Sequence, residues 1–169
     1  IGHGPFSHAL EHSFVNNISH EKISIQFMEE LNRIFKNKLS LAIKIFQNKY
    51  KKKYLYELIS SQIDVDRLDY LNRDSFYCGV AEGIVNSTRI IDMYNVHKGK
   101  LVLDYKGLYT IEKFILSRKL MYLQVYMHKT VLSAEYTLMN ILKRAKHLTT
   151  KKQKIFMTNS LKKFLNDEI

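Results

Sequence analysis

The sequence predicts a predominantly α-helical protein with one small β-hairpin near residues 89–105. Pro5 is its only proline, and there are six glycines among 169 residues, so the chain has few of the residues that a fold with many turns requires. Apolar residues recur three and four positions apart along most of the chain, as they do on one face of a helix. Hydrophobic residues make up 46% of the chain. That content suits one core, so residues 1–169 are predicted to form a single domain.

The helices can be placed by their apolar spacing. In the second of them, for example, Ile23, Phe27 and Leu31 lie four residues apart and define one amphipathic face. A helix opened by Pro5 is acceptable because proline is tolerated in a first helical turn. In chain order, helices are expected over residues 5–14, 21–35, 39–46, 54–60 and 64–74, and two more between residues 107 and 147.

The pattern changes between Arg89 and Tyr105. Apolar residues from Ile90 to Val96, then the polar run 97–100, then an apolar triplet at 101–103 predict a hairpin. After Thr149 the chain is expected to form one more basic helix or a frayed end.

Charge and cysteine content narrow the possible surroundings. The net charge is +11, concentrated over residues 49–53 and 143–163, and such surfaces attract nucleic acid, anionic membrane or nucleotide phosphates. A solvated lysine surface explains the charge equally well. Cys78 is the only cysteine, which excludes an internal disulfide framework, fits a reducing cytosol and is typical of a buried free thiol. No stretch approaches the ~18 apolar residues of a spanning helix, and no secretory signal is recognisable. We therefore expect a soluble cytoplasmic protein that does not bind membranes.

The segment from Asp64 to Asp74 has the richest chemistry. On a helix, one face would carry three groups of side chains: Asp66, then Asp69 or Tyr70, then Arg73 or Asp74. Divalent cations favour carboxylate oxygens, and phosphate favours Arg and Tyr donors. A solvated face with Asp–Arg pairs is the alternative. Leu68 and Leu71 are expected in the core in either case.

A second group of titratable side chains lies within the first 20 residues: His3, His8, Glu11, His12 and His20. Imidazoles can bind metal, donate to phosphate or act as acids near neutral pH. His8 to His12 also matches the H-x-x-E-H pattern of inverted zinc peptidases. That pattern is short, and nothing else in the chain supports peptidase chemistry.

Four segments, in order along the chain, resemble motifs of the HD-superfamily phosphohydrolases. The first, Ile1–His8, is similar to the sequence that directly follows the family's metal-binding His-Asp doublet. Next, His20-Glu21 matches a short His-Glu pair, and Asp64–Tyr70 resembles the stretch that carries the final metal-binding Asp. Finally, Tyr126–Thr130 resembles the Y-x-H-K patch of the deoxynucleoside triphosphate triphosphohydrolase branch. The resemblance extends from residue 1 to about residue 145.

The resemblance implies a helical bundle that holds a divalent metal ion, which could be Mn, Mg, Fe, Ni or Zn. The family's ligand set has the form His, His-Asp, Asp. Only the last member can be assigned in this sequence, to Asp66, and the others would precede Ile1. The chain is therefore expected to be an internal fragment, and residues 1–169 alone are expected to be inactive.

The resemblance also implies catalytic roles near the scissile phosphate. His3 and His8 correspond to histidines there, one of which would protonate the leaving oxygen. Glu11 stands where an acidic residue orients such a histidine, and His20 resembles a third active-site histidine.

Five further positions match substrate-binding residues of the family. Arg67 would neutralise phosphate charge, and Tyr70 would donate a hydrogen bond to a phosphate oxygen. Asp74 would accept one from a sugar hydroxyl. Arg118 would hold the distal phosphates, and Tyr126 would pack against the sugar.

The expected activity is metal-dependent hydrolysis of a nucleotide, with a deoxynucleoside triphosphate as substrate and intact triphosphate as product. One alternative is a phosphohydrolase of the same family that acts on another nucleotide. The other is a nucleotide- or nucleic-acid-binding regulator with little turnover. A homo-oligomer is expected in each case.

Overall fold

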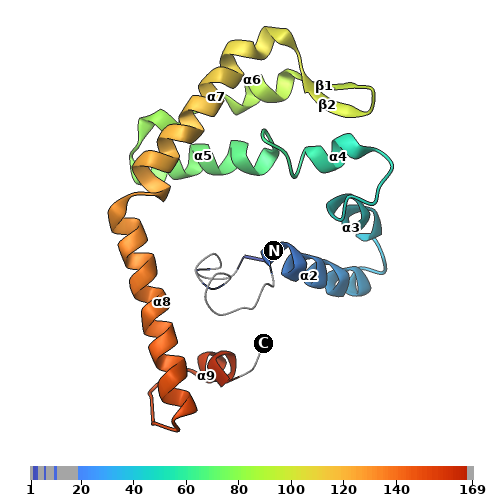
Figure 1. Cartoon of the computed structure of the whole chain (residues 1–169). Coiled ribbons are helices and arrows are strands. Elements are labelled where there is room, and N and C mark those ends of the chain that lie inside the picture. Colours follow the sequence, from blue (N-terminus) through green and yellow to red (C-terminus); the bar gives the residue numbers. More distant parts are fainter. Residues whose placement is uncertain (1, 4–5, 7–9, 11–18, 167–169) are drawn as a thin grey trace. The chain divides into compact units, whose positions relative to one another are not determined.

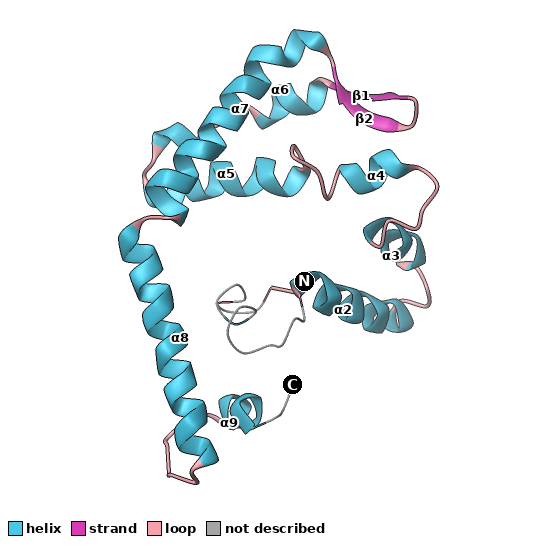
Figure 2. Cartoon of the chain, in the orientation of Figure 1, coloured by secondary structure: helices cyan, strands magenta, loops and turns pink. Residues whose placement is uncertain are grey.

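The computed structural model describes residues 2–3, 6, 10 and 19–166, so the helix expected over 5–14 lies mostly outside the described residues. The chain divides into two compact units, Met28–His128 and a second made of Ile1–Phe27 and Lys129–Ile169. Helices joined by short loops dominate both, and a two-stranded hairpin is the only sheet among the described residues (Figures 1 and 2). The predicted fold class is confirmed. The assignment of residues 1–169 to one domain stays a prediction.

Apart from α6, which was not expected, the helices lie close to their expected places. In chain order the elements are α2 (His20–Ile34), α3 (Ser40–Phe46), α4 (Lys53–Glu57), α5 (Val65–Cys78), α6 (Ser87–Asp92), β1 (Tyr94–His97), β2 (Lys100–Leu103), α7 (Leu108–Met121), α8 (Lys129–Thr150) and α9 (Asn159–Asn166). A 3₁₀ turn over Ala81–Gly83 precedes α6, another over Tyr105–Gly107 precedes α7, and a π-helical turn over Tyr122–Tyr126 follows α7.

The core of the Met28–His128 unit lies where α5, α6 and α7 meet. Phe114, Leu71, Ile90 and Met121 are fully buried there, and the predicted core positions Leu68 and Leu71 are confirmed. Figure 1 shows α7 passing across α5 with α6 beside it. The turn that ends at Gly83 packs so closely on α7 that a Cβ at this position would lie 2.6 Å from the Met121 sulfur.

Asn72 ties α5 to the segment that leads into α6. Its amide nitrogen donates to the Leu68 carbonyl (3.1 Å) and to the Ser87 hydroxyl (2.7 Å), and its amide oxygen accepts from the Val85 N–H (2.9 Å). One side chain therefore provides hydrogen-bond partners for backbone groups on both segments, and buried backbone groups without such partners would destabilise the fold.

Two expectations about this unit were wrong in detail. Ile90 and Ile91 lie in α6 and not in the hairpin, because the Asn86 side chain caps a helix there by accepting the Arg89 N–H (2.9 Å). Cys78, expected to be buried, is exposed. It lies in the last turn of α5, one turn beyond Ser75, which is the last buried residue of that helix.

The hairpin is antiparallel, with Tyr94 opposite Leu103 and His97 opposite Lys100. Its turn residues Lys98 and Gly99 both have positive φ angles, 48° and 76°, as a two-residue turn of type I′ requires. At its base, the Tyr94 hydroxyl donates to the carbonyl of Ile63, in the loop between α4 and α5. The hairpin thereby holds that loop in place.

In the other unit, α8 and α9 contact each other, and Leu165 of α9 is buried (2% exposed). The basic helix expected after Thr149 is present as α9. No helix in the described part of the chain is long and apolar enough to cross a bilayer.

Candidate functional site

The first component of the candidate site is the start of α5. Asp64 caps this helix: its carboxylate accepts the Arg67 N–H (2.9 Å) and the Ser61 N–H (3.2 Å), and the side chain is only 3% exposed. The Arg67 guanidinium pairs with the same carboxylate and donates to the Ser61 carbonyl (2.5 Å). A buried carboxylate needs such a partner, so Arg67 balances the charge of Asp64 in addition to its predicted role.

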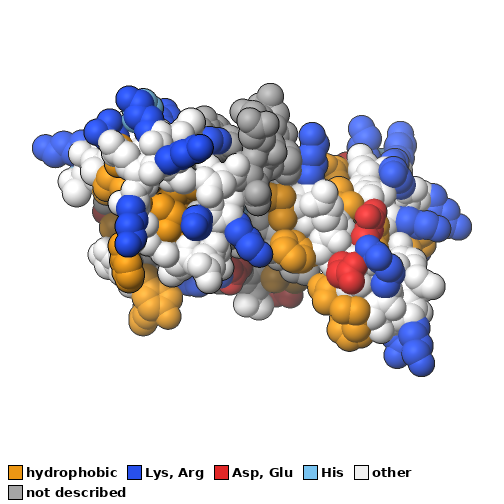
Figure 3. Space-filling view, turned by 90° about the horizontal axis from the view of Figure 1, so that it is seen from below, with side chains coloured by type: hydrophobic (Ala, Val, Ile, Leu, Met, Phe, Trp, Pro, Cys, Tyr) orange, Lys and Arg blue, Asp and Glu red, His pale blue; other side chains and the backbone are white. Residues whose placement is uncertain are grey.

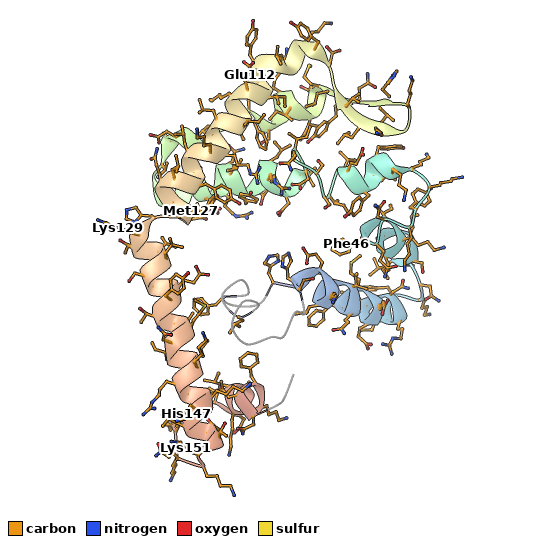
Figure 4. All side chains as sticks on the ribbon, viewed as in Figure 1. Phe46, Glu112, Met127, Lys129, His147 and Lys151 are labelled. Carbon is orange, nitrogen blue, oxygen red and sulfur yellow. The ribbon has the colours of Figure 1, made fainter. Side chains whose placement is uncertain are left out.

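The second component is the end of α7 with the π turn that follows it. The spacing of Arg118, Tyr122 and Tyr126 predicts that they line one side of a helix, and they do. The Arg118 guanidinium lies 5.5 Å from the centre of the Tyr122 ring, within the range of a cation–π interaction. The rings of Tyr122 and Tyr126 meet edge to face at 5.1 Å. Met127, labelled in Figure 4, closes this segment.

These two components meet through tyrosines. The Tyr126 hydroxyl donates to a carboxylate oxygen of Asp74 at 2.7 Å, and the Tyr126 ring lies 6.1 Å from the ring of Tyr70 in a T-shaped pair. Tyr70 and Asp74 are one helical turn apart on α5. The side chain of Tyr126 therefore connects the end of the π turn to the middle of α5.

Burial keeps both phenols in their neutral form. It is the largest cause that raises the pKa of Tyr126, and the hydrogen bond to Asp74 and the charge of that carboxylate raise this pKa further. Burial also raises the pKa of Tyr70, and the positive charges of Arg67 and Arg118 only partly oppose it. At neutral pH both tyrosines are thus O–H donors.

A cavity of about 500 Å³ lies beside this cluster, between the loop before α5 and the helix α7. Its lining is largely apolar, with Arg118, Lys119, Tyr122 and Gln62 as the polar contributors. The Arg118 guanidinium donates to the side-chain oxygen of Gln62 at 3.2 Å. Two cations on an otherwise apolar wall suit an organic ligand that carries negative charge.

Two guanidinium groups keep an unused donor. The Nε atoms of Arg67 and Arg118 are buried and have no hydrogen-bond partner among the described residues. Buried N–H groups are rarely left unpaired in folded proteins without a reason, such as an ion or a water molecule. Both groups lie near Tyr70, whose pKa responds to each of them.

The histidines His3 and His20 meet in the other unit, with ring centres 4.1 Å apart. Gly2 brings them together because its N–H donates to the Ser24 hydroxyl (2.9 Å), and a Cβ there would lie 2.0 Å from the His20 carbonyl oxygen. The His20 Nε2 lies 3.2 Å from a carboxylate oxygen of Glu21.

Glu21 is held in its ionised form. A hydrogen bond from the Ser19 side chain is the largest cause that lowers its pKa, and the charges of His20 and His3 contribute. Two imidazoles beside a carboxylate can hold and exchange a proton near neutral pH. His8 and Glu11, predicted to act with them, lie outside the described residues.

The five predicted substrate-binding residues all lie in the Met28–His128 unit: Arg67, Tyr70, Asp74, Arg118 and Tyr126. Asp66, the predicted metal ligand, is exposed on the first turn of α5. Among the residues that the structure describes, no three His, Cys, Asp or Glu side chains gather into a possible metal site. The described residues therefore offer one candidate ligand and do not form a metal site by themselves.

The sequence interpretation missed three contributors to the site. Asp64 could have been found, because an aspartate directly before a helix is a standard N-cap. Lys119 could have been suspected only because it is a second cation next to Arg118 in the sequence. Gln62 had no signal, since its contact with Arg118 joins residues 56 positions apart.

The family model described as "HD associated region" matches residues 85–164. A crystal structure of a phosphohydrolase from Bacteroides thetaiotaomicron is 49% identical and superposes with a TM-score of 0.95. That alignment covers 99% of this chain and 42% of the other.

Curated relatives align over most of this chain as well. The uncharacterized protein YwfO of Bacillus subtilis is 38% identical over 88% of this chain and 35% of its own length. A protein of Dictyostelium discoideum, named as a deoxynucleoside triphosphate triphosphohydrolase SAMHD1 homolog, is 27% identical over 80% of this chain and 30% of its own length. The chain thus spans about a third of the length of these curated relatives.

Proposed function

Since these comparisons support an HD-superfamily phosphohydrolase, we propose that the full-length protein hydrolyses nucleotides in a divalent-metal-dependent reaction. We further propose that its substrates are deoxynucleoside triphosphates and that intact triphosphate is released.

The cluster around the cavity is the observation that carries this proposal. Arg118 and Lys119 place positive charge on the cavity wall, and charge-assisted hydrogen bonds to phosphate are among the strongest in proteins. Tyr70 and Tyr126, which lie beside the cavity rather than in its lining, add neutral donors, and burial raises the pKa of each phenol further above neutral pH. The apolar remainder of the lining suits the uncharged part of a nucleoside. Together these features match a phosphorylated organic ligand better than a bare anion.

Each residue of the cluster has a proposed task. Arg118 binds the distal phosphates, and Tyr70 donates to a phosphate oxygen. Tyr126 packs against the sugar, and its bond to Asp74 (2.7 Å) fixes its ring. The second oxygen of Asp74 can accept from a sugar hydroxyl. Negative charge that develops during phosphate cleavage is stabilised by such preorganised donors.

We assign the leaving-group proton to the histidines. The family resemblance implies histidines near the scissile phosphate, and here the rings of His3 and His20 lie 4.1 Å apart, tilted by 40°, beside the ionised Glu21. His8 and Glu11 are proposed to complete this group.

A divalent metal ion would supply Lewis acidity and an activated water in such an enzyme. Asp66 is the one residue of this chain proposed to bind it, since its carboxylate is exposed at the start of α5. No further ligand is assigned here, and the metal could be Mn, Mg, Fe, Ni or Zn.

Hydrolysis of a nucleotide panel by the full-length protein tests the proposal. Deoxynucleoside triphosphates, ribonucleoside triphosphates and monophosphates are incubated with each metal, and phosphate and triphosphate are quantified separately. Triphosphate released from deoxynucleotides alone is the expected result. Turnover of ribonucleotides with release of single phosphates would support the family alternative and contradict the assigned substrate.

A regulator that binds nucleic acid with little turnover is the second candidate, and the basic surface favours it. Figure 3 shows many Lys and Arg side chains and few acidic ones on the face drawn. The exposed cations of α8 and its following loop are Lys129, Lys143, Arg144, Lys146, Lys151, Lys152 and Lys154. Salt-dependent binding of single-stranded RNA without nucleotide turnover would favour this candidate. The expected homo-oligomer and cytoplasmic location also stay predictions.

A further inference from the structure

We propose that Gln62 is a positioning residue that fixes the guanidinium of Arg118 for phosphate binding. This role rests on the proposed function and adds a residue that neither the motifs nor the comparisons assign. Gln62 belongs to the loop between α4 and α5, and Arg118 belongs to α7. Their contact crosses the mouth of the cavity that both residues line.

An arginine that binds a flexible polyphosphate gains from being held in advance, because ordering its long side chain costs conformational entropy. Two contacts hold Arg118. Its Nη1 donates to the Gln62 side-chain oxygen at 3.2 Å, and its guanidinium lies 5.5 Å from the Tyr122 ring centre. One contact fixes an edge of the guanidinium and the other fixes its position relative to the ring. A hydrogen bond with Tyr70 adds to these two contacts, and the Arg118 Nε, which has no hydrogen-bond partner among the described residues, is left for a ligand.

Gln62 can do this because its own backbone is anchored on both sides. The Ile63 carbonyl accepts the Tyr94 hydroxyl from the hairpin, and the Ile63 N–H donates to the Ser61 hydroxyl at 3.3 Å. Asp64, which follows, is buried as the cap of α5. An exposed glutamine on such a loop is held in place far better than one on a free loop.

The neutral amide of Gln62 suits the role. A carboxylate would hold the guanidinium at least as well, but it would cancel the positive charge that attracts phosphate, as Asp64 does for Arg67. A glutamine oxygen accepts one hydrogen bond and leaves the full charge available. Arg67 pairs with a carboxylate, whereas Arg118 pairs with a neutral amide. We therefore infer that Arg118, rather than Arg67, is available to bind an anionic ligand.

The test uses the full-length protein and two readouts, deoxynucleotide kinetics and calorimetric binding of inorganic tripolyphosphate. Gln62→Met keeps the length of the side chain and removes the acceptor, and Gln62→Glu keeps the acceptor and adds charge. Gln153→Met, at an exposed position after α8, is the matched control. Each Gln62 variant is also made with Arg118→Ala to complete a double-mutant cycle.

Gln62→Met should raise KM and the tripolyphosphate Kd about five-fold, the value of one ordinary hydrogen bond, with kcat nearly unchanged. Gln62→Glu should weaken binding by about ten-fold or more, because its charge opposes phosphate. In the Arg118→Ala background, Gln62→Met should have no further effect. Gln153→Met should resemble wild type in both readouts.

Three results would overturn the role of Gln62: an equal effect of Gln62→Met with and without Arg118, wild-type affinity in Gln62→Glu, or no tripolyphosphate binding by wild type. Binding with the expected coupling but without turnover of any nucleotide would instead refute the proposed function and support the positioning role.

Discussion

Removal of the Arg118 side chain is the sharpest test of the proposed binding of triphosphates. Arg118→Ala deletes a cation that lies on the wall of an open cavity, so its interaction with phosphate is intermediate between that in water and that in a protein interior. Two unit charges 4 Å apart interact by about 1 kcal/mol in water and about 4 kcal/mol near a protein surface. Because the Arg118 side chain is partly exposed, Arg118→Ala should lose about 2–3 kcal/mol of interaction with the phosphates, a roughly 30- to 150-fold fall in kcat/KM.

That loss should appear with deoxynucleoside triphosphates and be small, within about three-fold, with monophosphates, because the proposal assigns Arg118 to the distal phosphates, which monophosphates lack. Steady-state kinetics on matched substrate pairs measure both values. Arg73→Ala is the control, since it removes an exposed arginine that pairs with Asp69 on the same unit. Equal losses for the two substrates would mean that Arg118 is only structural.

Three further predictions concern other parts of the molecule. Asp66→Asn in the full-length protein should abolish metal-dependent hydrolysis with an unchanged circular dichroism spectrum, because the amide lacks the charge that a divalent ion favours; Asp69→Asn should lose much less, and wild-type turnover by Asp66→Asn at saturating metal would refute the assignment. Asn72→Ala should lower the free energy of unfolding by about 2–4 kcal/mol, since it removes three hydrogen bonds and leaves the Val85 N–H without its acceptor; urea titration checks this, with the exposed Asn95→Ala expected within about 0.5 kcal/mol of wild type. Tyr126 contributes pH-dependent stability: folding raises the pKa of its phenol above the ordinary 10.0, so its contribution is complete below that pH and is lost as the pH rises through the higher folded pKa. Tyr126→Phe should therefore lose less stability than wild type between pH 8 and pH 11, and identical slopes in urea unfolding would contradict this.

The fold could be predicted because its signals are local. Apolar spacing located α2 and α3, and the polar run before Leu101 located the hairpin turn. The errors at Ile90 and Cys78 came from events that apolar spacing does not encode. At Ile90, the Asn86 side chain caps a helix that includes the apolar residues expected in the hairpin. At Cys78, α5 continues beyond Ser75, its last buried residue, so the cysteine is exposed.

The site could be predicted only in part, for a different reason. Tyr126 and Asp74 lie 52 positions apart, and no local pattern joins them; they were identified through motifs that relatives share. Gln62 belongs to no such motif, and its contact depends on the path of a loop. Periodic patterns in a sequence indicate helices and strands, but they do not indicate the tertiary contacts of loop residues.

The two ends of the hairpin differ in how closely they contact the rest of the protein. Its base is fixed by Tyr94 on the Ile63 carbonyl, and β2 is held further along by the Leu101 N–H, which donates to the Glu57 carboxylate at 2.6 Å. Its tip, around Gly99, has no atom within 4 Å of where a side chain would start. Extra residues at the tip would only lengthen a ribbon in solvent. A one-residue slip in pairing would turn Tyr94 to the opposite face and remove its hydrogen bond to Ile63, which lines the cavity, so the register of this hairpin matters to the cavity more than its length does.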